Sequence, residues 1–154
     1  MPSISMRDRG NREQMSKGRP PPMPADVAAA FDAFPVAIAR RLRGIRGLIF
    51  KTAARLDGVG PLTETLKWGE PAYLTETSGS GTTIRLGWLR PSESHCAVLF
   101  NCKTTLVESF RERFPDEFVY QKNRAVLLDM ARPVPEAPLS ICLGMALTYK
   151  TRRY

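Results

Sequence analysis

Residues 66–73 read LKWGEPAY and mark the point at which helical sequence patterns give way to strand patterns. Glu70 precedes a proline, which restricts it to extended backbone conformations, and Gly69 is expected to adopt a positive φ. Two aromatic and two charged side chains lie within these eight residues. Either the aromatic side chains pack the bend, or they line a pocket to which the charged residues contribute polar contacts.

Two helices are predicted before this bend. The first is short and covers about residues 26–34, with Asp26 as its cap. The second covers about residues 35–56, where apolar residues recur at steps of three or four and form one stripe. Gly44 and Gly47 interrupt this pattern, and they either permit close packing or mark a bend in the helix. The stripe consists of Ile38, Leu42, Ile45, Ile49, Ala53 and Leu56.

Strand patterns follow the bend. Residues 82–88 alternate, which places Ile84, Leu86 and Trp88 on one face of a strand. Residues 96–100 are apolar on both faces and predict a central strand. Shorter strands are expected over residues 71–75 and 123–129.

Two further helices are predicted in the second half of the chain. Thr105 and Glu108 have the spacing of a capping box, which predicts a helix that ends before Pro115. A closing helix over about residues 138–149 is apolar almost all round and should be buried. The order of elements predicts an α+β fold, with N-terminal helices, an antiparallel sheet with one inserted helix, and a C-terminal helix.

Composition favours one soluble domain with an N-terminal tail. The chain has 154 residues, of which 43% are hydrophobic, and it contains no apolar run of the roughly 20 residues that a membrane span needs. Residues 1–23 are basic and Pro-rich and predict a flexible tail, followed by a single domain over residues 24–154. Three cysteines without CxxC spacing predict free thiols. We therefore expect a cytoplasmic location and no membrane partner.

The net charge of +8 is unevenly distributed. Residues 1–23 carry net +3 and residues 24–56 carry net +4, so most of the excess lies in the tail and the first helices. One hypothesis is nucleic-acid binding through the tail and the Arg40–Arg55 helix face. The alternative is a solvated helix face beside a basic tail, without a zinc-finger or RNP-type motif to indicate a specific nucleic-acid fold.

Several sequence blocks occur in an order that resembles a known family. These blocks are GVGPL at 58–62, ETLKWGEPAY at 64–73, GTTIRL at 81–86, KTTL at 103–106, NRA at 123–125 and ALTY at 146–149. Together they resemble the YdhG-like family of small bacterial domains of unknown function, over roughly residues 25–150. The resemblance implies a YdhG-like fold, with a curved antiparallel sheet packed by helices.

Some members of that family are described as frataxin-like iron chaperones, so the resemblance also implies iron chaperoning as an alternative function. Such a role needs a dense face of oxygen ligands. The nearest match is Glu108 and Glu112, followed by Asp116, but Arg111 and Arg113 are interleaved with them. This pattern equally indicates an ordinary salt-bridged helix surface.

A second candidate site lies at the predicted start of the helix after Thr105. Lys103 and Thr104 precede free backbone N–H groups that are able to hold a carboxylate or phosphate. Alternatively, Thr105 only caps the helix and Lys103 is solvated. Arg124 lies at a predicted strand entrance, where it either completes the same polar patch or is a surface arginine.

No catalytic constellation, metal-ligand motif or cofactor motif is recognised. His95 is the sole histidine, and Ser94 beside it on an extended chain is expected to point the other way. The leading hypothesis is therefore a non-enzymatic cytoplasmic binding module, without a metal or cofactor, for a small anionic ligand or a protein segment. The residues expected to bind this ligand are Lys67, Trp68, Glu70, Tyr73, Arg85, Lys103, Thr104 and Arg124.

Overall fold

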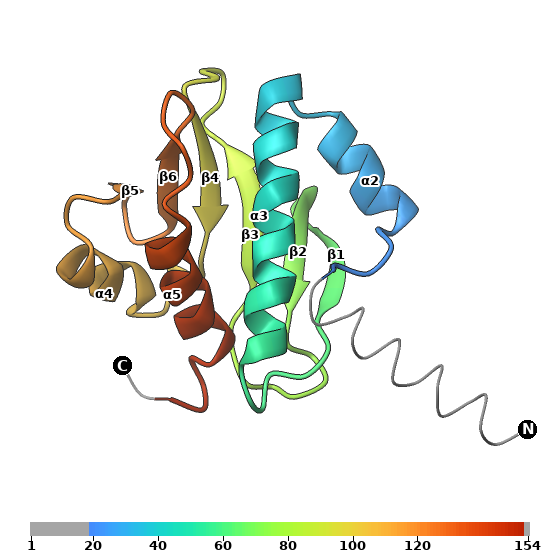
Figure 1. Ribbon diagram of the computed structural model, residues 1–154, viewed down its shortest axis with the longest axis vertical. Helices are drawn as coiled ribbons and strands as arrows, with labels where there is room; N and C mark the ends of the chain where they lie inside the picture. Colours follow the sequence, from blue (N-terminus) through green and yellow to red (C-terminus); the bar gives the residue numbers. More distant parts are fainter. Residues whose placement is uncertain (1–18, 153–154) are drawn as a thin grey trace, which may run out of the picture.

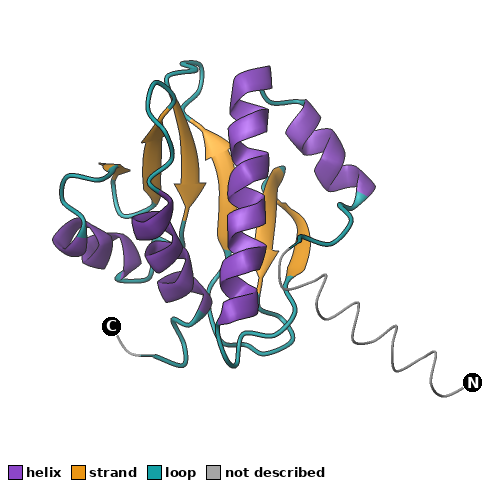
Figure 2. Cartoon of the chain, viewed as in Figure 1, coloured by secondary structure: helices purple, strands orange, loops and turns teal. Residues whose placement is uncertain are grey.

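A computed structural model of the protein describes residues 19–152, which form an antiparallel sheet with helices packed on one face (Figure 1, Figure 2). The helices are α2 (Ala25–Asp32), α3 (Val36–Arg55), α4 (Leu106–Arg113) and α5 (Glu136–Leu147). The strands are β1 (Thr63–Lys67), β2 (Glu70–Leu74), β3 (Ile84–Trp88), β4 (His95–Leu99), β5 (Val119–Gln121) and β6 (Ala125–Asp129). Their order across the sheet is β1-β2-β3-β4-β6-β5. The α+β class, with α4 inserted between strands and α5 closing the fold, is confirmed.

Alternation along the strands gives the sheet two different faces. On β3, Ile84 and Leu86 are fully buried and Trp88 packs against the same core, as predicted, while Arg85 lies on the opposite face. The covered face forms one core with all four described helices. The opposite face, which we call the uncovered face, has only a small apolar cluster made by Ala97, Ala125 and Leu127 with Leu89 and Leu99.

The predicted bend at residues 66–73 is a tight hairpin between two strands. Lys67 pairs with Glu70 across β1 and β2, which leaves Trp68 and Gly69 as a two-residue turn. Their φ angles are 55° and 76°, and two consecutive positive values are typical of a type I′ turn. The positive φ of Gly69 is confirmed. Strand β1 was not predicted, and we call Lys67–Glu70 the hairpin tip.

A buried ion pair fastens β1 to α3. Arg46 donates two hydrogen bonds to the carboxylate of Glu64, at 2.5 and 2.8 Å, and the side chains are 7% and 5% exposed. The hydroxyl of Tyr73 donates to the same carboxylate at 2.9 Å. Arg46 also donates to the carbonyl of Pro21 at 2.7 Å, so one side chain joins α3, β1 and the chain before α2.

Some predicted details of the helices are corrected. Pro24, not Asp26, is the N-cap of α2, and it has no side-chain hydrogen bond. Helix α5 begins at Glu136, two residues before Pro138. Most of the predicted tail, residues 1–18, lies outside the described residues. Among the described helices, none combines the length and apolar character required to cross a bilayer.

Neither glycine in α3 serves close packing. Helix α3 is continuous from Val36 to Arg55, and a Cβ added at Gly44 or Gly47 would meet nothing within 4 Å. We therefore expect Gly44→Ala, at an exposed position, to raise the free energy of unfolding by about 0.5–1 kcal/mol. Urea unfolding tests this, with Gly81→Ala as the opposite control because its Cβ would lie 2.3 Å from the carbonyl oxygen of Ala146. A loss of stability in Gly44→Ala would contradict the absence of close neighbours at this position.

Candidate functional site

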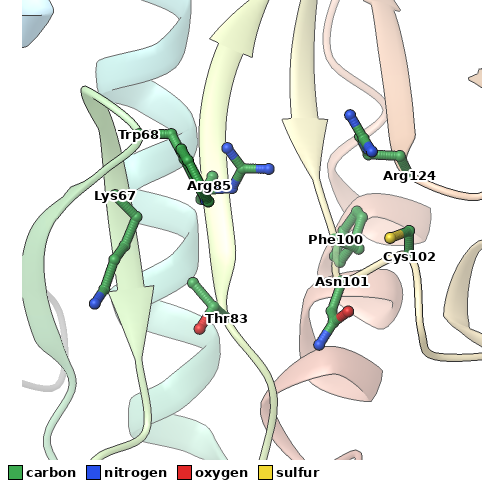
Figure 3. A pocket seen from close by; sticks show the side chains of 8 residues that line it. All are labelled: Lys67, Trp68, Thr83, Arg85, Phe100, Asn101, Cys102 and Arg124. Atoms are coloured by element: carbon green, nitrogen blue, oxygen red, sulfur yellow. The ribbon is translucent and has the colours of Figure 1, made fainter.

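A pocket of about 610 Å³ lies on the uncovered face, where Figure 3 shows α3 and α5 behind the strands. The hairpin tip borders one side of it, β3 forms the middle, and the segments after β4 and before β6 border the other side (Figure 3). We call this the sheet-face pocket. Its lining residues are Lys67, Trp68, Thr83, Arg85, Phe100, Asn101, Cys102 and Arg124.

Trp68 is the most unusual of these residues. Trp68 is 88% exposed, although tryptophan is a large apolar residue that is usually highly buried. Its φ of 55° lies in the left-handed region, which is uncommon for a bulky residue and costs roughly 1–3 kcal/mol. Of the two alternatives for Trp68, the structure agrees with the one in which it lines a pocket, and the indole extends over the uncovered face (Figure 3).

Arg85 occupies the middle of the sheet-face pocket and is held by Glu70. The guanidinium Nη1 donates to Glu70 Oε1 at 2.6 Å, and the two side chains are 21% and 28% exposed. The carboxylate of Glu70 rests against Gly87, where a Cβ would come within 2.2 Å of Oε2. Burial raises the pKa of the Glu70 carboxyl group, and the charge of Arg85 opposes this effect. Only Nη1 of Arg85 is engaged, so its other N–H groups remain able to bind a ligand.

Arg124 reaches the sheet-face pocket from the start of β6. Its carbonyl accepts a hydrogen bond from the backbone N–H of Phe100 at 2.7 Å, which joins the entrance of β6 to the end of β4. The amide of Asn123 donates to the carbonyls of Cys102 and Thr104 at 2.9 and 3.0 Å. Asn123 therefore fixes the 101–104 loop against the strand that carries Arg124.

At the predicted anion site at the start of α4, three of the backbone N–H groups already have partners within the protein. The N–H of Lys103 donates to Asn101 Oδ1 at 2.9 Å, and the N–H of Leu106 points to Thr104 Oγ1 at 3.4 Å. The N–H of Thr105 donates to the hydroxyl of Tyr149 at 3.3 Å. Thr105 is the N-cap but its side chain makes no capping bond, so the predicted capping box is wrong. Lys103 and Thr104 do not line the sheet-face pocket.

Tyr73 lies on the other side of the sheet from the sheet-face pocket. It is fully buried, packs edge-on against Phe50 of α3 at 5.7 Å between ring centroids, and donates to Glu64. Burial raises the pKa of its hydroxyl. Its predicted place beside Trp68 therefore gives way to a structural role, because on β2 Tyr73 faces the helices while Glu70 faces the opposite side of the sheet.

Lys67, Trp68, Arg85 and Arg124 are thus brought together from the predicted set, with Glu70 beside them. Four lining residues were not predicted: Thr83, Phe100, Asn101 and Cys102. The only sequence signal for them was their adjacency to strand ends, which does not reveal which ends share a face.

The sheet-face pocket is strongly cationic. Lys67, Arg85 and Arg124 line it and no carboxylate does. Within residues 19–152, Arg85 has one ion pair, to Glu70, while Lys67 and Arg124 have none. Asn101 and Thr83 add neutral polar groups. Anions are therefore the ligands that this set of groups favours.

One thiol lies in the sheet-face pocket and two are inaccessible. Cys102 is exposed, whereas burial raises the pKa of Cys96 to about 11 and that of Cys142 to about 12. Because the thiolate is the reactive form, we expect iodoacetamide at pH 8 to modify Cys102 alone in the folded protein and all three cysteines after denaturation. Peptide mass spectrometry measures this. Rapid modification of Cys142 in the folded protein would contradict the described burial.

Other predicted chemistry is placed away from this region. Ser94 does contact His95, with its hydroxyl 2.8 Å from Nδ1, so the prediction that they point apart is wrong; the contact lies in an exposed turn that also includes Ser92. Glu108 and Glu112 are exposed on α4. Among the described residues, no three His, Cys, Asp or Glu side chains are grouped as metal ligands would be.

The cationic face of α3 is smaller than predicted. Arg41 donates to the carbonyls of Asp129 and Arg132, both at 2.7 Å, and Arg46 is buried with Glu64.

Comparison with protein-family models, with curated proteins and with solved structures finds no match, so the resemblance to YdhG-like domains stays a prediction.

Proposed function

We propose that this protein is a non-enzymatic cytoplasmic binding module that holds a small anionic ligand in the sheet-face pocket. The observation that carries the proposal is the convergence of Lys67, Arg85 and Arg124 around one depression without a lining carboxylate. These residues come from three separate parts of the chain. Arg85 is 21% exposed and uses one guanidinium nitrogen to bind Glu70, so its other N–H groups are available to hydrogen-bond an anion.

The dimensions of the site support a small molecule more than a protein segment. A volume of about 610 Å³ lies within the range of ordinary ligand pockets. The hairpin tip and the 101–104 loop enclose it from two sides, and Asn123 and the β1–β2 pairing fix both borders. Such a preformed site loses little conformational freedom when a ligand binds.

Inorganic phosphate provides the first test. We expect phosphate to raise the melting temperature and to slow the alkylation of Cys102, relative to chloride at equal ionic strength. Arg124→Gln should lose most of both effects, because it removes a charge that lines the pocket and that has no ion pair within the described residues. Arg40→Gln is the matched control: it removes the same charge from the exposed surface of α3.

Two results would contradict the proposal. The first is that no anion slows the alkylation of Cys102 in the wild-type protein. The second is that Arg40→Gln and Arg124→Gln weaken phosphate binding equally, which would indicate general attraction to a chain of net charge +8.

A further inference from the structure

We infer that the ligand of the sheet-face pocket is a phosphate monoester joined to a flat ring, of which a nucleoside monophosphate is the simplest example. The inference rests on the proposed function and narrows its ligand class. It combines two independent observations: the charge of the pocket and the conformation of Trp68.

The charge balance favours a dianion over a single carboxylate. Lys67, Arg85 and Arg124 contribute three positive charges, and Glu70 beside Arg85 contributes one negative charge, which leaves a net charge of +2. A carboxylate would neutralise half of this excess. A phosphate monoester carries about −1.5 to −2 at pH 7 and has three acceptor oxygens, so it matches both the charge and the several unused N–H donors.

Trp68 supplies a flat apolar surface at the rim of the same pocket. Its indole packs against no described aromatic ring, and at 88% exposure nearly all of its surface is in contact with water. Residues with no Cβ, or with a short polar side chain, adopt a positive φ far more readily. Keeping tryptophan in a strained and exposed position is explained if its ring stacks on a ligand.

The placement of the two features defines how the ligand would lie. Trp68 is on the hairpin side of the pocket, Arg85 is in the middle and Arg124 is on the far side (Figure 3). A ligand with its ring on Trp68 and its phosphate toward Arg85 and Arg124 would span this depression. Because stacking on an aromatic side chain tolerates any base, the geometry specifies ring plus phosphate and leaves base identity open.

The test compares three probes on the full chain: adenosine 5′-monophosphate, ribose 5-phosphate and adenosine. Affinity is measured by protection of Cys102 from iodoacetamide, and stacking by quenching of tryptophan fluorescence. We expect the nucleotide to bind about tenfold or more tightly than either fragment. Asparagine tolerates a positive φ, so Trp68→Asn should keep the turn. It should lower the affinity for the nucleotide to the affinity for ribose 5-phosphate. Trp68→Phe, which keeps a ring, should retain part of the difference.

The outcomes separate the inference from the proposed function. If ribose 5-phosphate binds as tightly as the nucleotide and Trp68→Asn changes neither, the pocket binds anions but the inference fails. If adenosine binds as tightly as the nucleotide, or if no probe protects Cys102, both fail. Trp88, the other tryptophan, is half-buried against the core, so its fluorescence should not respond to a ligand in the pocket. If the fluorescence of Trp68→Asn is still quenched by the nucleotide, the proposed stacking on Trp68 is contradicted.

Discussion

Replacing Arg46 with methionine should lower the free energy of unfolding by roughly 3–5 kcal/mol, because it leaves a charge buried without its partner. The substitution leaves the carboxylate of Glu64, which is only 5% exposed, without its two charged hydrogen bonds. The hydrogen bond to Glu64 raises the pKa of Arg46, and this effect exceeds the opposing effect of burial. Urea unfolding measures the loss.

Two variants make this expectation specific. Arg43 lies three residues before Arg46 on α3, and Arg43→Met removes only an exposed ion pair to Asp32 of α2, so it should cost less than about 1 kcal/mol. Arg46→Met/Glu64→Gln should be more stable than Arg46→Met alone, because no uncompensated charge stays buried and the amide still accepts from Tyr73. Equal losses in Arg43→Met and Arg46→Met would contradict the described burial of the Arg46–Glu64 pair.

Replacing Arg85 with glutamine should weaken phosphate binding about 10- to 100-fold, the largest functional effect we expect. Arg85 lies at the centre of the sheet-face pocket and has unused N–H groups besides the one bound to Glu70. Because Arg85→Gln also leaves Glu70 without its partner, Glu70→Gln/Arg85→Gln is the better variant for calorimetry. If the double variant binds phosphate as tightly as Glu70→Gln alone does, Arg85 does not contribute to the site.

The single variant Glu70→Gln has the opposite expected effect on binding. Its carboxylate competes for Arg85, so its removal should strengthen phosphate binding, by about threefold to tenfold. Burial raises the folded-state pKa of Glu70 above 4.5, so the contribution of Glu70 to stability should fall as pH rises through that pKa. Glu70→Gln should therefore gain stability relative to wild type between pH 4 and pH 7.

Periodicity revealed the elements that bury an apolar side. The stripe of α3 and the alternation of β3 are both regular, and both elements form where they were predicted. Strand β1 was missed because its inward positions are Glu64 and Leu66, so a charge stands where the pattern needs an apolar residue. Glu64 is tolerated at this buried position because it pairs with Arg46 of α3. A local sequence pattern cannot indicate a partner so distant in the chain.

The candidate site was predictable only in part, for a related reason. The aromatic and charged residues of the hairpin tip drew attention, and Lys67, Trp68, Arg85 and Arg124 do line one pocket. Tyr73 could not be separated from them without the register of β2, which turns it to the covered face. Lys103 and Thr104 do not line this pocket, and the nearby N–H groups of Lys103 and Thr105 bind side chains of Asn101 and Tyr149. The second contact spans 44 residues, so no local pattern could indicate it.

An NMR titration with inorganic phosphate tests the central claim most directly. Amide shifts should concentrate at the hairpin tip, around Thr83–Arg85, across Phe100–Cys102 and at Arg124, which are distant in sequence and meet only at the sheet-face pocket. The exposed surface of α3 should stay unchanged. Shifts confined to residues 40–55 or to the basic N-terminal residues, with the pocket residues unaffected, would contradict the account.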